Sequence, residues 1–401
     1  MPLAQSQQPK WPQKQFKKDG SPTVHAEKYY GTGHNVYRID RKILSQPLNL
    51  RNPKHVTDFL LTQGWIPTEY NTRQDAYGNK ERTSPKLTED SFGSIRGGLG
   101  QQVAMYRKLS SRFDIMTGWF NACRSDGRIP TPIGGKAASH RIRHSVVVNV
   151  PKAADDVFFG RQMREVFIAT PGYVLAGVDA DACQLRTLAE ALYRYNLGDV
   201  DFATAVISGR KSDGTDVHTI NRNRINSILG SEMVTRTHAK NLTFGSIFGA
   251  GPAKIAAMVG CSPTVAKKIL EVFFTVLPGI IPLRLKLKEE YERQGYLEGL
   301  DGRRLYGVPT RVLLVDLMQM DESAVMEIAM CRAYDQFKKL DIPARQLIYY
   351  HDEINYECPL GYEEQVGSIL EECIPWAGRF LNTKVPFKGE AKFGLSWATC
   401  H

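Results

Sequence analysis

Two aspartates, Asp179 and Asp352, lie where strands could present them as metal ligands. Asp179 follows the short apolar run Val174 to Val178, which predicts a buried strand. An aspartate at the end of a buried strand projects from a rigid element, which is a good way to fix a metal ligand. The alternative is a helix cap, because Asp179 or Asp181 could cap the helix that follows. For Asp181 we favour the cap over a third metal contact.

The second aspartate is followed directly by Glu353 in the segment QLIYYHDEINYEC. Two strand-like halves, LIYY and INYE, flank the acids and predict a tight hairpin with carboxylates at its tip. Adjacent carboxylates repel each other, so a bound cation would make the bend better tolerated. A solvated turn is the alternative, but the flanking residues are too apolar for a freely exposed ribbon.

The most specific pattern is a four-residue repeat in TRTHAKNLTFGSIFGAG. On a helix between an N-cap at Thr235 and a stop at Gly249, the repeat makes one stripe. The stripe consists of Arg236, Lys240, Phe244 and Phe248. Cations in a first turn oppose the helix dipole by roughly 0.3–1 kcal/mol each, and a bound triphosphate would reverse that sign. An amphipathic core helix is the alternative, and it explains the phenylalanines but not the cations.

Two strand-borne carboxylates from distant parts of the chain suit a two-metal site. One metal would activate an attacking oxygen, and the other would stabilise a leaving pyrophosphate. Hard oxygen ligands favour Mg²⁺ or Mn²⁺, so we expect two Mg²⁺ ions, with Mn²⁺ as a substitute.

The composition is that of a globular protein with excess positive charge. The chain has 401 residues, 42% of them hydrophobic, and a net charge of +10. This charge favours a polyanionic partner such as nucleic acid, or an anionic membrane surface, although a merely soluble basic protein is the alternative. Half of the excess lies in residues 1–46, which carry eight Lys and Arg against three Asp and Glu. No stretch of about 18 apolar residues occurs, so we expect no membrane span.

The seven cysteines are widely spaced and include no Cys-x-x-Cys pair. This pattern favours reduced thiols in a cytoplasm. A structural zinc site is not expected, because His140 and His144 lack a nearby cysteine or second histidine pair.

Periodic segments predict the elements that position these residues. HVTDFLLTQGW predicts a helix that stops at Gly64, and a long amphipathic helix starts at Gln101. Residues 66–98 are polar and rich in turn residues. GYVLAGVDADACQLRTLAEALYRY predicts a strand followed by a helix, and residues 216–295 are expected to be mostly helical.

Three of these segments resemble motifs A, B and C of family A DNA polymerases, the group that includes bacterial DNA polymerase I. Among its members, the replicative polymerases of short-tailed phages are most similar. Motif A, Asp-x-Ser-x-x-Glu-Leu-Arg, resembles DADACQLR at 179–186. Motif B, Arg-x3-Lys-x3-Phe/Tyr-x3-Tyr-Gly, resembles residues 236–249, and motif C, His-Asp-Glu, resembles 351–353. Further similar segments are GWIPTEYN at 64–71, SHRIRH at 139–144, TDVHT at 215–219, GLDGRR at 299–304 and the ending GLSWATCH.

The resemblance covers about residues 48–401 and implies an α+β, right-hand polymerase fold. Such a fold has a palm with an antiparallel sheet, helical fingers and a helical thumb. The expected divisions are a basic arm at 1–47, a thumb at 48–130, a first palm part with motif A at 131–215, fingers with motif B at 216–305, and a second palm part with motif C at 306–401.

The resemblance also implies a role for each matched residue. The metals would be held by Asp179, Ala180 and Asp352. The catalytic residues would be Asp179, Asp352, Glu353 and Lys240. The nucleotide would be bound by Arg236, Lys240, Phe244, Phe248, His218 and Gln184. The DNA would be contacted by Arg141, Gln319 and His351.

The implied function is template-directed DNA synthesis: deoxynucleotides are added to a primer 3′ end by two-metal-ion nucleotidyl transfer. The implied partners are primed DNA template and deoxynucleoside triphosphates, with a separate exonuclease subunit or replisome proteins as further candidates. We expect a role in phage DNA replication, in the cytoplasm of the host cell. A single-subunit RNA polymerase and an inactive DNA-binding relative are the alternatives.

Two departures from the family pattern concern the sugar of the nucleotide. The family's motif A glutamate, which blocks a ribose 2′-hydroxyl and bonds a motif B tyrosine, is replaced by Gln184. The tyrosine is replaced by Phe248, which has no hydroxyl. A charged glutamate left unpaired there would be costly, so Gln184 keeps the bulk without the charge. We expect sugar selection to survive through shape but to be weaker than in family members that keep the glutamate.

A third departure concerns proofreading. Family members commonly carry an upstream exonuclease domain built on an Asp-x-Glu cluster. Only about 46 residues precede the expected thumb, and residues 1–130 contain no Asp-x-Glu. We therefore expect no 3′→5′ exonuclease in this chain. Either the exonuclease is a separate polypeptide, or the chain is a fragment.

Overall fold

The computed structural model describes residues 17–18, 21, 23–30, 48–67, 69–74 and 80–400. Most of the basic arm predicted at 1–47 lies outside the described residues, as do Thr68 and His401, which belong to two of the matched segments. The chain forms two compact units: residues 1–66 with 90–104, and residues 67–89 with 105–401. Within the described ranges, no helix has the length and apolar character needed to cross a membrane.

The smaller unit contains the first predicted helix, α3 (Pro53–Thr62), whose existence is confirmed. Asn52 caps it by accepting from the backbone N–H of Lys54 at 2.9 Å. Its buried face includes Leu60. The short helix η2 (Glu89–Ser94) brings Ser91 to Trp65, whose indole N–H donates to the serine hydroxyl at 2.9 Å.

The second predicted helix, α4 (Gly98–Ala122), is also confirmed and begins three residues before Gln101. In the larger unit, β1 (Tyr70–Gln74) and β2 (Lys80–Pro85) pair as an antiparallel ribbon. Sequence analysis described this region only as polar and turn-rich. The ribbon has no apolar alternation to detect, because the described side chains of β1 after Tyr70 are exposed.

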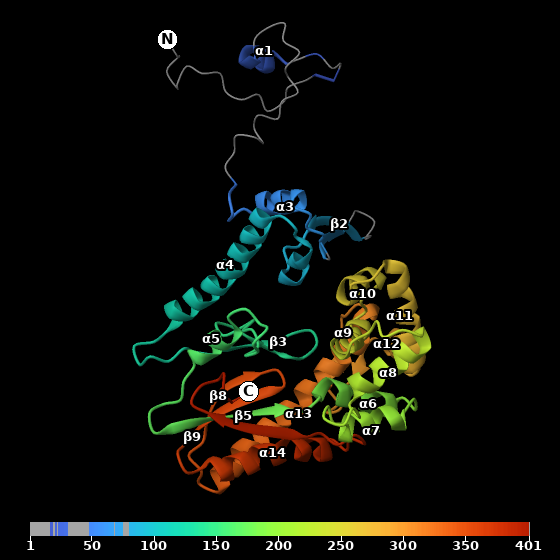
Figure 1. Cartoon of the computed structure of the whole chain (residues 1–401). Helices are drawn as coiled ribbons and strands as arrows, with labels where there is room; N and C mark the ends of the chain where they lie inside the picture. The colour runs from blue at the N-terminus through green and yellow to red at the C-terminus, as the bar shows by residue number, and fades with distance from the viewer. Residues whose placement is uncertain are drawn as a thin grey trace. The chain divides into compact units, whose positions relative to one another are not determined.

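The centre of the larger unit is a four-stranded antiparallel sheet in the order β10-β5-β9-β8. Its strands are β5 (Tyr173–Ala180), β8 (Arg345–Tyr350), β9 (Glu353–Pro359) and β10 (Gly389–Gly394). Helices α13 (Leu313–Lys339) and α14 (Glu363–Phe380) pack beside it, as Figure 1 shows. Apolar residues of β9 such as Ile354 and Tyr356 share a core with these helices.

The alternate residues of β9 are polar yet buried: Glu353, Asn355 and Glu357 are each at most 2% exposed. They point to the other face of the sheet, because successive strand residues alternate. That face is covered by a core of Trp119, Val147, Val150, Met163, Leu175, Ile348, Trp397 and Cys400. Helix α5 (Gly160–Glu165) and two short strands, β3 (Ile133–Lys136) and β4 (Ile142–His144), lie in the segment between α4 and β5. A side chain at Gly177 of β5 would overlap the Cys400 carbonyl, so glycine there lets the C-terminal segment cross the sheet.

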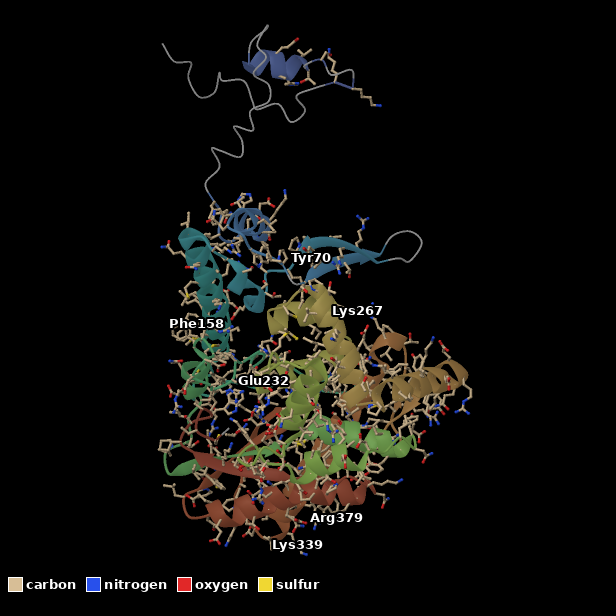
Figure 2. All side chains as sticks on the ribbon, turned by 45° about the vertical axis from the view of Figure 1, so that its right-hand side comes forward. Tyr70, Phe158, Glu232, Lys267, Lys339 and Arg379 are labelled. Carbon is tan, nitrogen blue, oxygen red and sulfur yellow. The ribbon has the colours of Figure 1, made fainter. Side chains whose placement is uncertain are left out.

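Helices build the rest of the larger unit, as expected for residues 216–295. They are α6 (Cys183–Arg194), α7 (Val200–Ser208), α8 (Val217–Leu229), α9 (Arg236–Ile247), α10 (Pro252–Val259), α11 (Pro263–Val276) and α12 (Ile280–Gln294). They share a core that includes the fully buried Leu188, Ile225 and Phe273. Burial of each such side chain stabilises the fold by about 1.5–3 kcal/mol. Lys267 on α11 and Lys339 at the end of α13 lie far apart within this unit (Figure 2).

Three short elements join α12 to α13. They are β6 (Leu297–Glu298), β7 (Arg304–Leu305) and η3 (Thr310–Val312). The core of the helical part also includes α6 and α7, which precede the boundary expected at residue 216. The predicted domain divisions remain predictions.

Candidate active site

The two aspartates meet at one end of the sheet. Strands β5 and β9 pair so that Asp179 lies directly opposite Glu353. The backbone N–H of Ala180 donates to the carbonyl of Asp352 at 2.9 Å. Both aspartates are half-buried. The strand pairing therefore brings together three residues that were predicted to hold the metals.

The predicted hairpin is confirmed. Tyr350 pairs with Glu353, so His351 and Asp352 form a two-residue turn between β8 and β9. His351 has a φ of 62°, a positive value of the kind that tight hairpin turns need at the first turn residue. The acids lie at the tip of this hairpin, as expected.

The helix-cap prediction for Asp181 is wrong. Ala182 occupies the N-cap position of α6, and no side chain caps this helix end. The Asp181 carboxylate accepts a hydrogen bond from Arg186 at 2.9 Å instead. The buried guanidinium of Arg186 needs an anionic partner, and this need decides where the carboxylate lies.

The chemistry of the donors fits a hard cation. Asp179 and Asp352 supply carboxylate oxygens, which Mg²⁺ prefers, and Mg²⁺ commonly takes only one or two carboxylates with waters and substrate phosphates. Across the described part of the chain, no group of three or more His, Cys, Asp or Glu could hold a metal ion. Metal binding by the two aspartates remains a prediction.

Glu353 is buried and hydrogen-bonded. The indole N–H of Trp397 donates to its carboxylate at 2.6 Å, the amide of Asn355 at 2.8 Å and the guanidinium of Arg164 at 3.5 Å. Arg164 also lies over the Trp397 ring, 4.3 Å from its centroid. These contacts tie the hairpin to the C-terminal segment. The expected catalytic role of Glu353 stays a prediction.

The predicted cap and stop of α9 are confirmed. The Thr235 hydroxyl accepts from the backbone N–H of His238 at 3.1 Å, and the helix ends at Ile247, before Gly249 at a φ of 78°. The rings of Phe244 and Phe248 are stacked with centroids 6.4 Å apart. Phe248 is 45% exposed, so its ring is available to a ligand.

The cations of α9 differ in their partners. Arg236 forms an ion pair with Asp216 at 2.8 Å, and Asp216 also caps α8. Burial acts to raise the pKa of Asp216, but hydrogen bonds from Arg236 and Thr219 outweigh it and lower the pKa to about 2. An amphipathic core helix therefore accounts for Arg236, because Asp216 balances its charge.

An amphipathic core helix does not account for the charge of Lys240. Among the described residues, no carboxylate forms an ion pair with Lys240 or with Lys152. Burial lowers the pKa of Lys240, and the charges of Lys152 and Arg236 lower it further. Cations that crowd together without a counter-ion form a site for an anion. Sequence analysis missed Lys152, because nothing in its local sequence places it near α9.

His218 joins the same group of residues. Its ring lies 5.9 Å from that of Phe244, and its buried Nδ1 has no hydrogen-bond partner within the described structure. Burial, then the charges of Lys240 and Arg236, lowers the pKa of His218 to about 4. The ring is therefore neutral at pH 7. The structure thus brings together five of the six residues predicted to bind the nucleotide: His218, Arg236, Lys240, Phe244 and Phe248. Nucleotide binding by these residues remains a prediction.

The predicted DNA-contacting residues lie near the hairpin and on α13. The guanidinium of Arg141 donates to both carboxylate oxygens of Glu322 on α13, at 2.7 Å each. His351 lies 5.7 Å from His144, ring to ring, and burial together with Arg141 and His144 lowers the pKa of His351 to about 4. Gln319 is half-buried on α13. Sequence analysis did not single out Glu322.

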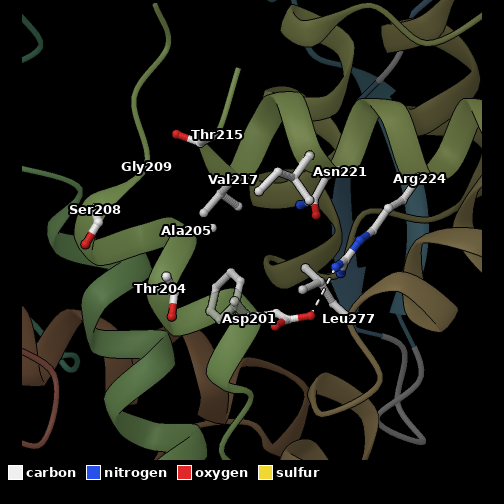
Figure 3. Close-up of a pocket in the computed structure, with 12 residues that line it drawn as sticks. Asp201, Thr204, Ala205, Ser208, Gly209, Thr215, Val217, Asn221, Arg224 and Leu277 are labelled. Carbon is white, nitrogen blue, oxygen red and sulfur yellow. Dashed lines mark hydrogen bonds and ion pairs between the residues drawn. The ribbon is translucent and has the colours of Figure 1, made fainter. Parts of the chain in front are cut away.

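A separate cavity of about 450 Å³ lies mainly on α7 and α8. Figure 3 shows the ion pair between Asp201 and Arg224 at this cavity, with Nη2 and Oδ2 3.3 Å apart. Val217 and Leu277 contribute apolar surface. None of the predicted site residues lines it, so this cavity is not the site described above.

Comparisons with known proteins agree on one family. The family model of DNA polymerase family A matches residues 32–399. The chain is 23% identical to the DNA-directed DNA polymerase of Escherichia phage T7, over 86% of this chain and 52% of the phage protein. It is 24% identical to DNA polymerase I of Pseudomonas aeruginosa, over 92% of this chain and 40% of that enzyme. The chain thus spans about half or less of the length of these relatives.

A solved structure is similar in fold. The polymerase domain of Pol1 from M. smegmatis, in complex with DNA primer-template and dNTP, matches with a TM-score of 0.71 at 21% identity. The match covers 89% of this chain and 63% of that one. At this identity the likeness shows the fold alone, which is the α+β right-hand fold that the sequence predicted.

Proposed function

The chain belongs to DNA polymerase family A, and from this premise we propose that it is a template-directed DNA polymerase. It would add deoxynucleotides to the 3′ end of a primer. The observation that carries the proposal is the meeting of Asp179 and Asp352 at one end of the sheet. Lys240 and Lys152, which have no carboxylate partner in the part of the chain that the structure describes, support it.

Asp179, Ala180 and Asp352 would hold two Mg²⁺ ions, for which Mn²⁺ could substitute. Bound there, the ions would supply the activation of the primer hydroxyl and the stabilisation of the pyrophosphate leaving group. The chain's own residues would hold the reactants in line. Lys240, with Arg236 beside it, would bind the triphosphate, since cations near a helix N-terminus attract phosphate.

The neutral ring of His218 would offer a hydrogen bond to a phosphate oxygen, because its Nδ1 is buried and has no hydrogen-bond partner within the described structure. Phe244 and Phe248 would stack on the base and sugar. Arg141, Gln319 and His351 would contact the DNA at the primer end. Positioning of this kind, with charge stabilisation, accounts for most of the catalysis of phosphoryl transfer.

The proposed partners are primed DNA and deoxynucleoside triphosphates, and the M. smegmatis domain was solved with both kinds of ligand. The phage relatives support a role in phage DNA replication, in the cytoplasm of the host cell. A separate exonuclease or other replisome proteins would act with the chain. Because residues 1–130 contain no Asp-x-Glu, we propose that it does not excise a mismatched 3′ nucleotide. Excision in a proofreading assay would contradict this part.

Extension of a labelled primer on a DNA template, with Mg²⁺ and deoxynucleotides, tests the main proposal. We expect template-matched extension by the unmodified chain and its loss in Asp352→Ala, by about 10³-fold or more, because charge stabilisation is a large part of catalysis. Tight DNA binding without extension by the unmodified chain would contradict the proposal and favour a role in DNA binding.

A further inference from the structure

Glu322 is a carboxylate that the mechanism above does not use, although it lies beside the site. It is on α13 and its side chain is fully buried. Arg141 donates to both of its oxygens at 2.7 Å. Burial raises the pKa of Glu322, and the Gln184 side chain, as a hydrogen-bond donor within reach, is among the groups that lower it. One buried carboxylate thus joins the residue expected at the primer end to the residue expected at the sugar.

The charge of Glu322 acts on the same buried thiol, Cys183, as the charges of Asp352 and Asp179. Burial raises the pKa of Cys183, and the charges of Glu322, Asp352 and Asp179 raise it further, so these groups share one neighbourhood. Burial also raises the pKa of Glu322, to about 7, against the opposing effect of Arg141. A buried acid that lost these partners would be costly, so the contacts restrain both partners.

The departures from the family pattern explain why such a restraint is needed. The family's motif A glutamate is held by a motif B tyrosine, but here Gln184 and Phe248 stand at the two positions, and Phe248 has no hydroxyl. The amide of Gln184 therefore needs another acceptor to fix its position. Glu322 supplies one from α13, a different element of the fold.

We infer that Glu322 is a positioning residue, which orients Gln184 against the sugar of the incoming nucleotide and Arg141 toward the primer end. This inference rests on the proposed function and extends it to sugar selection. The carboxylate acts through its two partners and does not touch the substrate.

The test is the ratio of kcat/KM for a deoxynucleotide to kcat/KM for the matching ribonucleotide. Glu322→Gln keeps the shape but loses the charge and one acceptor oxygen. We expect the ratio to fall about 10-fold, a size that one misplaced contact at a hydroxyl commonly produces. A merely structural defect would lower both kcat/KM values together and leave the ratio unchanged. Glu327→Gln is the matched control, since Glu327 is on the same helix but bonds Lys136, Ser323 and Arg303.

An exchange of the two side chains supplies the second test, because it moves the carboxylate from position 322 to position 184. Gln184→Glu places two carboxylates in contact, and we expect it to lower primer extension. The double variant Gln184→Glu/Glu322→Gln restores one carboxylate to the pair, so we expect it to be more active than Gln184→Glu by about 10-fold. Residues in direct contact give such non-additive effects, whereas independent residues do not.

The outcomes separate the two claims. A ratio within about 2-fold of the unmodified chain in Glu322→Gln, or strictly additive effects in the double variant, would overturn this inference, since residues in contact couple by more than this. No extension by the unmodified chain would overturn the proposed function instead. Extension with a lowered ratio and a rescued double variant would support both.

Discussion

Burial lowers the pKa of Lys240, and the charge of Lys152 lowers it further although the two residues are 88 positions apart in the chain. Neither has a carboxylate partner among the described residues, so the site they share gains from binding an anion. We expect Lys152→Ala to raise KM for the deoxynucleotide by about 10- to 100-fold, since a hydrogen bond to a charged group contributes about 1.5–3 kcal/mol. Steady-state kinetics of single-nucleotide addition would measure this change.

The matched control is Lys339→Ala, which removes the same charge from the exposed end of α13. We expect its KM to stay close to that of the unmodified chain. Equal effects of the two substitutions would mean that Lys152 acts only through net charge.

The lowered pKa of His218 leads us to expect that the stability of the fold depends on pH. Its folded-state pKa is about 4, whereas a histidine in an unfolded chain titrates near 6.5. Between about pH 4 and 6.5 the unfolded chain therefore binds more protons, and the contribution of this group to stability is lost as the pH falls. The slope is at most about 1.4 kcal/mol per pH unit. We expect urea unfolding to show a larger loss of stability from pH 7.5 to pH 5.5 in the unmodified chain than in His218→Gln.

His351 shares this kind of shift, so both proteins will lose some stability over the same interval. The informative quantity is the difference between the two losses. Equal losses in the two proteins would show that His218 is not kept neutral by its surroundings.

At the scale of elements, the sequence predicted α3, α4, β5 and the acidic hairpin, because each combines a clear apolar pattern with recognisable turn or cap residues. It did not predict the ribbon of β1 and β2, whose exposed strands carry no such pattern. The cap at Asp181 failed for a different reason, since Arg186 binds the carboxylate. Contacts such as that of Arg141 with Glu322 depend on α13 crossing the site, and no local sequence pattern records them.

At the same scale, we expect the hydrogen bond between the C-terminal segment and the hairpin to affect stability and the Mg²⁺ requirement. Trp397 donates to the buried carboxylate of Glu353, next to Asp352 in the hairpin. Trp397→Phe keeps an aromatic side chain but removes the indole N–H donor, so we expect the free energy of unfolding to fall by about 1–3 kcal/mol. We also expect a higher Mg²⁺ concentration for half-maximal extension, because the hairpin that carries Asp352 is less well held.

Trp376→Phe is the control for this substitution. Trp376 stacks on Phe380, with ring centroids 5.2 Å apart, and bonds no buried carboxylate among the described residues. A Mg²⁺ requirement that changed equally in both variants would show that Trp397 supports the fold and not the hairpin.

At the scale of the whole molecule, net charge governs how the chain would hold DNA. On the proposed function, phosphate contacts would supply most of the affinity and position the duplex, and base contacts would be few because the template can have any sequence. The net charge of +10 is concentrated at the N-terminus, because residues 1–46 carry half of it and the remaining residues carry the other half. The two halves of this charge can be separated by truncation.

We expect DNA binding to weaken steeply with salt, by about 10³-fold or more between 50 and 200 mM if six or more phosphates are contacted. The slope of log Kobs against log salt counts those contacts, at about 0.9 per phosphate on duplex DNA. Removal of residues 1–46 takes away eight cations, so we expect a shallower slope in the truncated chain. Titrations of a labelled primer-template at several KCl concentrations would measure both slopes. If the slope is unchanged while affinity is kept, the DNA contacts lie outside the arm, and its charge serves another partner.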